Sequence, residues 1–214
     1  ATIYRAFGRP YNEEGKKLLG APFSQFMKFN TEFRHLWNMD KNNKIASRVA
    51  LGALFAYGNA TIAPYSEQFY VGGANSIRAF TIRSLGPGSY RPPANDRNGY
   101  LDQTGDFKLE ANIEYRFGIM GRLNGAVFLD AGNIWLLKKD PKRPGAELKW
   151  KGFLNDIALG TGFGLRYDIS YLVIRADLGI GLHTPYPNPD KKGYYNISSF
   201  KDGLGFHLAI GYPF

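Results

Sequence analysis

The sequence contains no cysteine, which excludes disulfide bonds and thiolate metal sites. Histidine is also scarce: only three occur among the 214 residues. His35, His183 and His207 are far apart in sequence and have no ligand-like spacing. The residue types that most often hold metals are therefore missing or scattered, and we expect neither a metal site nor a cofactor.

Motifs of catalysis are absent as well. None of Ser24, Ser66 and Ser170 lies in the Gly-x-Ser-x-Gly turn that positions the nucleophile of many hydrolases. The run GTGFG at residues 160–164 faintly resembles a nucleotide-binding loop. It lies inside an alternating strand pattern, however, and this context favours close backbone packing. We expect a protein that is not an enzyme.

No apolar run approaches the roughly 18 residues that a membrane-spanning helix needs. The mean hydropathy of −0.31 would suggest a soluble protein. That conclusion is unsafe, because a membrane β-barrel places its apolar side chains at every second residue. No signal peptide begins at Ala1, which is expected of a mature, truncated or cytosolic chain.

The net charge of +9 could indicate nucleic acid, an anionic surface or simply basic loops. Many of the cations lie in turn-rich segments: Lys138, Lys139, Lys142, Arg143, Lys149, Lys151, Lys191 and Lys192. A nucleic-acid binder would need these charges on a defined face with stacking aromatics. We therefore expect no nucleic-acid partner, and interpret the cations as solvated loops or contacts with anionic surface glycolipid.

Apolar and polar residues alternate with a period of two along most of the chain. In KLEANIEYRF, residues 108–117, one face is apolar and the other is charged. Seven segments have this pattern: residues 26–37, 48–58, 108–117, 123–135, 159–168, 172–182 and 206–214. TIYRAFG, residues 2–8, is a weaker eighth candidate. No segment has convincing helical periodicity, so we predict an all-β fold.

The connections between these segments alternate between short and long. Short turns follow the first, third and fifth segments, and long polar stretches separate the others. Short periplasmic turns and long external loops are typical of a transmembrane antiparallel β-barrel. Aromatic residues near the strand ends, such as Tyr57, Tyr115 and Tyr167, fit interfacial girdles. A soluble sandwich or ligand-binding barrel is the alternative.

The longest connection, residues 59–106, has many apolar residues for a loop exposed to solvent. Gly72 and Gly73 predict a tight turn, and Arg78 follows shortly afterwards. A desolvated arginine needs carboxylate partners. The polar strand faces offer five: Glu110, Glu114, Asp130, Asp168 and Asp177. We predict that the loop folds into the barrel lumen and that Arg78 pairs there; an exposed surface arginine is the alternative.

These residues resemble the BamA/TamA superfamily of outer-membrane assembly and translocation barrels. FYVGGANSIRAF, residues 69–80, resembles its lumen-plugging loop, whose hallmark is Val-Arg-Gly-Phe/Tyr after a Gly-Gly. Here the tetrad is Ile77-Arg78-Ala79-Phe80, with Ala in place of Gly. The resemblance implies that Glu114 of ANIEYRF and Asp130 of VFLDAGNIW bind the loop arginine.

The last segment, FHLAIGYPF, resembles the closing strand of this family, which carries its assembly signal. The alternation places five residues on one face: Phe206, Leu208, Ile210, Tyr212 and Phe214. Pro213 cannot donate to a ladder and suits a weakly paired seam. The resemblance implies that the first and last strands form a lateral gate. The stretch before residue 27 resembles the Bacteroidetes branch.

The family barrel has about sixteen strands, and about eight fit in this chain. We therefore expect residues 1–214 to form the C-terminal half of a larger outer-membrane barrel, with residues 59–106 as the lumen loop. A self-contained small barrel, or two copies that pair, is the alternative, although an eight-stranded barrel would be filled by its own side chains.

The resemblance implies a bacterial outer-membrane insertase or translocase. Its partners would be outer-membrane lipids, unfolded or exported client proteins, and possible periplasmic or lipoprotein partners. The alternatives are a pore dedicated to secretion of one partner protein, the anchor barrel of a surface lipase, a small structural barrel, and a soluble binding module.

Overall fold

The computed structural model describes residues 17–18, 21–93, 96, 99–191, 193–197 and 201–214. Its main element is a seven-stranded antiparallel sheet in the order β3-β4-β5-β6-β7-β8-β9. The strands are β3 (Gln25–Asn38), β4 (Asn43–Tyr57), β5 (Phe107–Met120), β6 (Leu123–Trp135), β7 (Ala158–Asp168), β8 (Val173–His183) and β9 (Leu204–Ile210). The all-β prediction is confirmed, and each of the seven strong sequence patterns corresponds to one strand.

The remaining elements are short. Strands β1 (Lys17–Leu18) and β2 (Ala21–Pro22) pair with each other, and the helical turns are η1 (Tyr65–Glu67), α2 (Gly99–Asp102), α3 (Phe153–Asp156) and η2 (Lys201–Gly203). Among the described residues, no helix is long and apolar enough to cross a membrane. The weak eighth strand candidate, TIYRAFG, lies outside the described residues.

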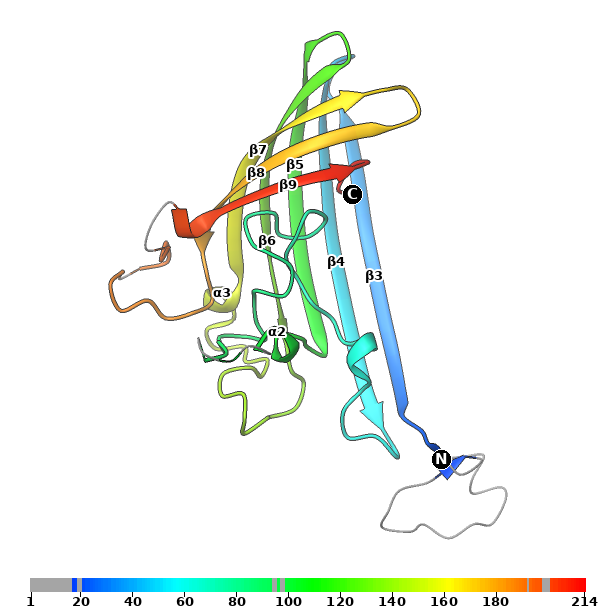
Figure 1. The fold of residues 1–214 in the computed structure, drawn as a ribbon, viewed down its shortest axis with the longest axis vertical. Coiled ribbons are helices and arrows are strands. Elements are labelled where there is room, and N and C mark those ends of the chain that lie inside the picture. The colour runs from blue at the N-terminus through cyan, green and yellow to red at the C-terminus, as the bar shows by residue number, and fades with distance from the viewer. Residues whose placement is uncertain (1–16, 19–20, 94–95, 97–98, 192, 198–200) are drawn as a thin grey trace.

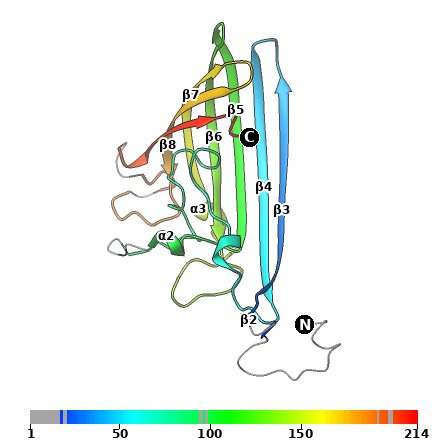
Figure 2. The same ribbon diagram turned by 45° about the vertical axis from the view of Figure 1, so that its right-hand side comes forward.

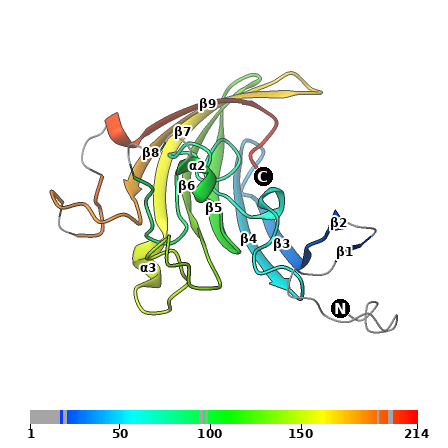
Figure 3. The ribbon, with the colours of Figure 1, turned by 60° about the horizontal axis from the view of Figure 1, so that its bottom comes forward.

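The sheet curls into an arc, so the fold is a partial barrel (Figures 1 and 3). Each strand pairs with its neighbour in sequence, and β3 and β9 are the two edges. Short turns join β3 to β4, β5 to β6 and β7 to β8, while the long connections gather at the opposite end of the sheet (Figure 1).

The two faces of the sheet have opposite chemistry. On β5, Glu110, Asn112 and Glu114 are buried on the concave face, whereas Ile113 on the convex face is 47% exposed. The same parity holds on β6, where Asp130 is fully buried and Val127 is 49% exposed. A soluble barrel would bury its apolar face instead. The soluble alternative is therefore wrong, and the convex face is the one suited to lipid.

The described residues between β4 and β5 run along the concave side of the sheet, where the views of Figures 2 and 3 both place them. A small hydrophobic core holds this loop near the long-connection end. Its residues are Leu54, Ala63, Phe69, Val71, Ile77, Leu85, Ile134, Ala158 and Tyr186. The apolar content of the loop is thus explained, because these side chains pack among themselves and against the wall.

The last residues depart from the predicted strand. The sequence pattern extends the outward face of the last strand to Tyr212 and Phe214, but β9 ends at Ile210. Gly211 adopts a left-handed φ of 82°, which turns the chain out of the strand. The Phe214 ring then lies over Arg116 of the concave face, 5.7 Å from the guanidinium carbon. The Tyr212 ring lies 4.2 Å from the same carbon, so the prediction that Tyr212 and Phe214 share a face with Phe206, Leu208 and Ile210 is wrong.

Candidate functional site

The glycine pair begins the turn that presents Arg78. Gly72 and Gly73 both have left-handed backbone angles, with φ of 94° and 90°. Gly73 N donates to Phe80 O at 2.8 Å, and Gly72 N donates to Ser76 Oγ at 2.9 Å. A Cβ on Gly72 would lie 2.2 Å from the Thr81 carbonyl oxygen, so the turn requires glycine there.

Arg78 is completely buried against β5 and β6. Its guanidinium makes a bidentate contact with Asp130, in which Nε lies 2.8 Å from Oδ2 and Nη2 lies 2.9 Å from Oδ1. Its backbone N also donates to Asp130 Oδ2 at 3.0 Å, and Nη1 donates to Glu114. The structure thus brings together the three charged residues that the sequence singled out.

An aromatic side chain completes the enclosure of this arginine. The Phe128 ring lies with its centre 3.5 Å from the guanidinium carbon, a stacking distance for a cation–π contact. Phe128 comes from the concave face of β6, two residues before Asp130. The guanidinium is therefore held at its edge by carboxylates and on its face by a ring, a geometry that lysine cannot reproduce.

The charge network is larger than the sequence indicated. Arg166 on β7 lies 3.2 Å from Glu114 and 2.6 Å from Asp177, and Arg175 on β8 lies 2.7 Å from Asp177. Arg175 Nη1 also donates to the loop carbonyl of Ala74 at 2.9 Å. The parity of the strands placed these side chains on the polar face, but it could not show which of them pair.

A second branch of the network holds the start of the turn. Arg48 on β4 lies 3.1 Å from Glu110 and donates to Asn112 at 2.9 Å. Ser76 donates to Glu110, and Asn112 Nδ2 donates to the Ser76 carbonyl at 2.9 Å. Strands β4 to β8 therefore all contribute polar groups that bind residues 74–78 directly or through one another.

Glycines on the concave wall let the loop backbone approach closely. Ideal Cβ atoms on Gly179 and Gly205 would lie 2.5 and 2.6 Å from the Arg78 carbonyl oxygen. An ideal Cβ on Gly160 would lie 2.5 Å from the Ala79 Cβ. The alanine at position 79, where the family has glycine, is therefore accommodated because residue 160 has no side chain. Within residues 160–164, Gly160 faces the loop at Ala79, whereas Gly162 faces the Phe128 ring and Gly164 faces Arg166 and Asp177.

The last strand also binds the turn directly. His207 Nε2 of β9 lies 2.9 Å from the Arg78 carbonyl oxygen. Because a carbonyl only accepts, Nε2 must carry the proton in this contact. This residue was not among those selected from the sequence, since a lone histidine in a strand pattern gave no signal of its partner.

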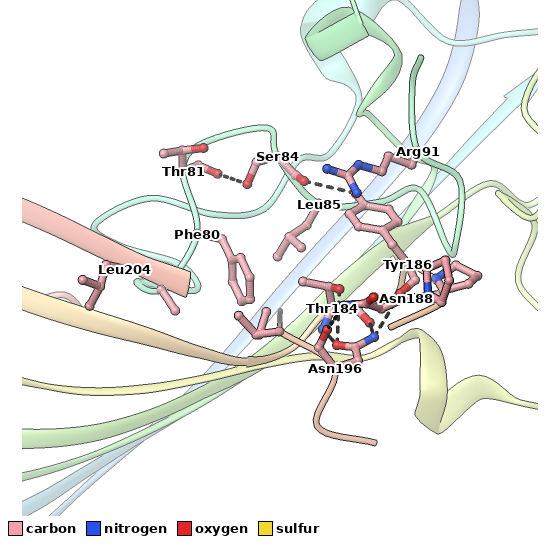
Figure 4. Close-up of a pocket in the computed structure, with 14 residues that line it drawn as sticks. Phe80, Thr81, Ser84, Leu85, Arg91, Thr184, Tyr186, Asn188, Asn196 and Leu204 are labelled. Carbon is pink, nitrogen blue, oxygen red and sulfur yellow. Dashed lines mark hydrogen bonds between the residues drawn. The ribbon is translucent and has the colours of Figure 1, made fainter. Parts of the chain in front are cut away.

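Beyond Arg78, the loop packs against the β8–β9 connection around a cavity of about 420 Å³ (Figure 4). Phe80 and Leu85 face it from the loop, and Thr184 and Asn196 face it from the connection. Tyr186 Oη donates to the Ser84 carbonyl at 3.1 Å and accepts from Gly86 N at 3.0 Å. Burial raises the pKa of Tyr186 to about 12, which keeps this donor protonated.

The outward residues of β9 are apolar and exposed, unlike the buried charges of the site. Phe206, Leu208 and Ile210 are 64%, 70% and 71% exposed on the convex face.

Within the part of the chain that the structure describes, no group of residues is arranged to hold a metal ion. The chemistry that the site offers is fixation of a loop through buried ion pairs.

Residues 15–214 match the family model described as the Omp85 superfamily domain. The outer membrane protein assembly factor BamA of Nitratidesulfovibrio vulgaris is 28% identical over 173 residues, which cover 77% of this chain and 20% of that protein. The crystal structure of BamA from Haemophilus ducreyi lacking POTRA domains 1-3 matches with a TM-score of 0.58 at 17% identity.

That structural match covers 87% of this chain and 35% of the other, so the chain spans only part of either relative. The structural match agrees with the observed partial barrel. Since the family model extends over nearly all of the sequence, the chain belongs to the Omp85 superfamily and forms part of a bacterial outer-membrane β-barrel.

Proposed function

We propose that this chain is the C-terminal part of a barrel that inserts or translocates proteins at the outer membrane. The observation that carries the proposal is the position of β9. Among the described strands, β9 pairs only with β8, so its other edge is unpaired. On the concave face, His207 attaches β9 to the loop that Arg78 anchors. An edge held in place from within is suited to receive a strand from another chain.

The proposed mechanism uses the hydrogen-bonding groups of this edge. An incoming strand would pair with β9 as a strand pairs in β-augmentation, and its apolar side chains would extend the lipid face formed by Phe206, Leu208 and Ile210. In the complete barrel, about sixteen strands would enclose the lumen, and the first of them would be the opposite side of the gate. Clients would be unfolded outer-membrane proteins or exported chains.

Arg78, Glu114 and Asp130 act in this proposal as a latch that fixes the loop to the wall. Removing one partner of a buried ion pair costs about 3–5 kcal/mol, because the remaining charge stays buried without compensation. Arg78→Ala would leave Asp130 without its bidentate partner and would remove the contact with Glu114, so that residue 78 would keep only its backbone contacts with Asp130 and His207.

The test introduces Arg78→Ala into the full-length protein. We expect the loop to become accessible to protease and the levels of client barrels in the outer membrane to fall severalfold. Arg91→Ala is the matched control, since it removes the same charge from an exposed position of the same loop. An Arg78→Ala protein with wild-type protease protection and wild-type client levels would overturn the latch and the proposed function.

The same experiment separates assembly from dedicated secretion. A pore for one partner protein would lose export of that partner while the other outer-membrane proteins kept their normal levels. A general fall in client barrels supports assembly.

A further inference from the structure

The barrel wall has a notch at the end where the long connections gather. Strand β4 continues to Tyr57, but its pairing with β5 ends where Ala53 faces Phe107. Beyond this pair, Leu54 N donates to Asp106 O at 2.7 Å, and no further β4–β5 partner follows. A cavity of about 410 Å³ occupies the gap between the end of β4 and the segment 136–143 that follows β6.

Apolar side chains line much of this notch. Leu54 and Leu136 are buried, whereas Phe55, Ile62 and Leu137 remain 45%, 63% and 36% exposed. Phe55 belongs to the convex, lipid-facing parity of β4. An exposed apolar surface at the rim of a membrane barrel has acyl chains as its natural neighbours.

Cations stand around the same cavity. Lys138, Lys139 and Lys142 line it, are exposed, and form no ion pair with any residue that the structure describes. Arg143, in contrast, is held 2.7 Å from Asp140. Asp106 also lines the cavity, and its Oδ2 accepts a hydrogen bond from Leu137 N at 3.3 Å. With Asp106 and Asp140 on the same lining, four cations face two carboxylates, so the net positive charge of the cavity comes from the lysines.

We propose that this notch binds an anionic acylated lipid of the outer leaflet, of the phosphorylated glycolipid class. The acyl chain would lie along Phe55, Ile62 and Leu137, and the phosphate would contact Lys138, Lys139 and Lys142. The combination of an apolar lining with lysines around it matches both parts of such a lipid. The proposal depends on the outer-membrane location of the barrel and not on its role in protein assembly.

The test measures binding of bisphosphorylated lipid A to the full-length protein in detergent by native mass spectrometry and titration. Each lysine near an anionic lipid surface is worth about fivefold in binding. We expect the triple variant Lys138→Gln/Lys139→Gln/Lys142→Gln to bind lipid A at least about tenfold more weakly. A difference in gel migration between unheated and heated samples verifies that the variant barrel is folded.

The matched control is Lys41→Gln/Lys44→Gln/Arg122→Gln, which removes the same charge from the short-turn end of the sheet. We expect it to bind lipid A like the wild type. An equal loss in both triple variants would mean nonspecific attraction to a basic protein and would overturn the site. Wild-type binding by the lysine triple variant, or no binding by the wild type, would overturn it as well.

A second pair of variants separates a lipid site from a phosphate site. Ile62→Ser/Leu137→Ser should weaken binding of lipid A severalfold while binding of its deacylated phosphorylated disaccharide stays unchanged. If inorganic phosphate displaced lipid A completely, or if the serine variant bound lipid A normally, the acyl chain would have no place in the notch and the lipid proposal would fail.

Discussion

The two edge strands of the sheet differ in almost every respect. Strand β3 pairs with β4 at each of its 14 residues, yet all but the first two of them are exposed. Strand β9 has only seven residues, but Gly205 on its concave side is buried and His207 and Ala209 are partly covered. Long β3 is thus bare on both faces, and short β9 is covered on one.

The difference shows which edge strand is covered by other residues of this chain. The polar face of β3 is exposed, and its Lys28 reaches the loop through a single ion pair with Glu67. The concave side of β9 is already occupied by the Arg78 turn. An unpaired edge is a ready template for another strand, and β9 is the edge whose concave residues are buried or partly covered by the loop.

The largest expected difference between the two edges comes from adding a side chain to β9 where the Arg78 turn contacts it. In Gly205→Val, the new Cβ would collide with the Arg78 carbonyl, which lies 2.6 Å from the ideal Cβ position. Overpacking of this kind costs about 1–3 kcal/mol. We expect the loop to lift from β9, which limited proteolysis of the folded barrel would detect.

Ala209→Val is the control for this substitution, because it adds bulk to the concave side of the same strand four residues further on. If Gly205→Val left the loop as protected as Ala209→Val does, the turn would not depend on the bare wall of β9.

A smaller effect is expected from the single hydrogen bond between β9 and the turn. His207→Phe keeps a ring but removes the donor to the Arg78 carbonyl, a loss of about 1 kcal/mol. Hydrogen exchange of the β9 amides should accelerate several-fold. His207→Gln, which retains a donor, should restore much of the protection; equal exchange in both variants would show that the contact adds nothing.

The smallest effect is expected at β3. Lys28 Nζ lies 3.3 Å from Glu67 Oε2 of the loop, and both side chains are about a third exposed or more. Ion pairs of this kind contribute about 0–1 kcal/mol. Lys28→Ala should change neither loop proteolysis nor the heat stability of the barrel measurably. A loss as large as that of Gly205→Val would contradict the asymmetry between the two edges.

Much of the fold could be predicted from the sequence because a strand has a period of two. The alternation assigned Glu114 and Asp130 to the polar face among five carboxylates, and the family resemblance implied that these two bind the arginine. The long loop was recognisable for a similar reason, since side chains such as Val71 and Ile77 need an apolar environment.

Other features depend on tertiary contacts that no local pattern encodes. His207 meets the Arg78 carbonyl across 129 positions of sequence, and Arg166 binds Glu114 across 52. The course of Phe214 was mispredicted because a single left-handed residue, Gly211, ends the strand, and glycine occurs inside strands of this chain as well. The positions of the glycines in the strands do not indicate which segment of backbone will pack against them.

Those glycines have a mechanical consequence. A sheet bends most readily toward a face that lacks side chains, because no Cβ atoms crowd together on the inside of the bend. Gly160, Gly162 and Gly164 of β7, Gly179 of β8 and Gly205 of β9 leave the concave side bare over three adjacent strands. In Figure 1 these strands sweep across the direction of β3 and β4. Because the Arg78 turn and the Phe128 ring fill the space that the missing Cβ atoms leave, the curvature of the wall next to the β9 edge is coupled to the seating of the loop.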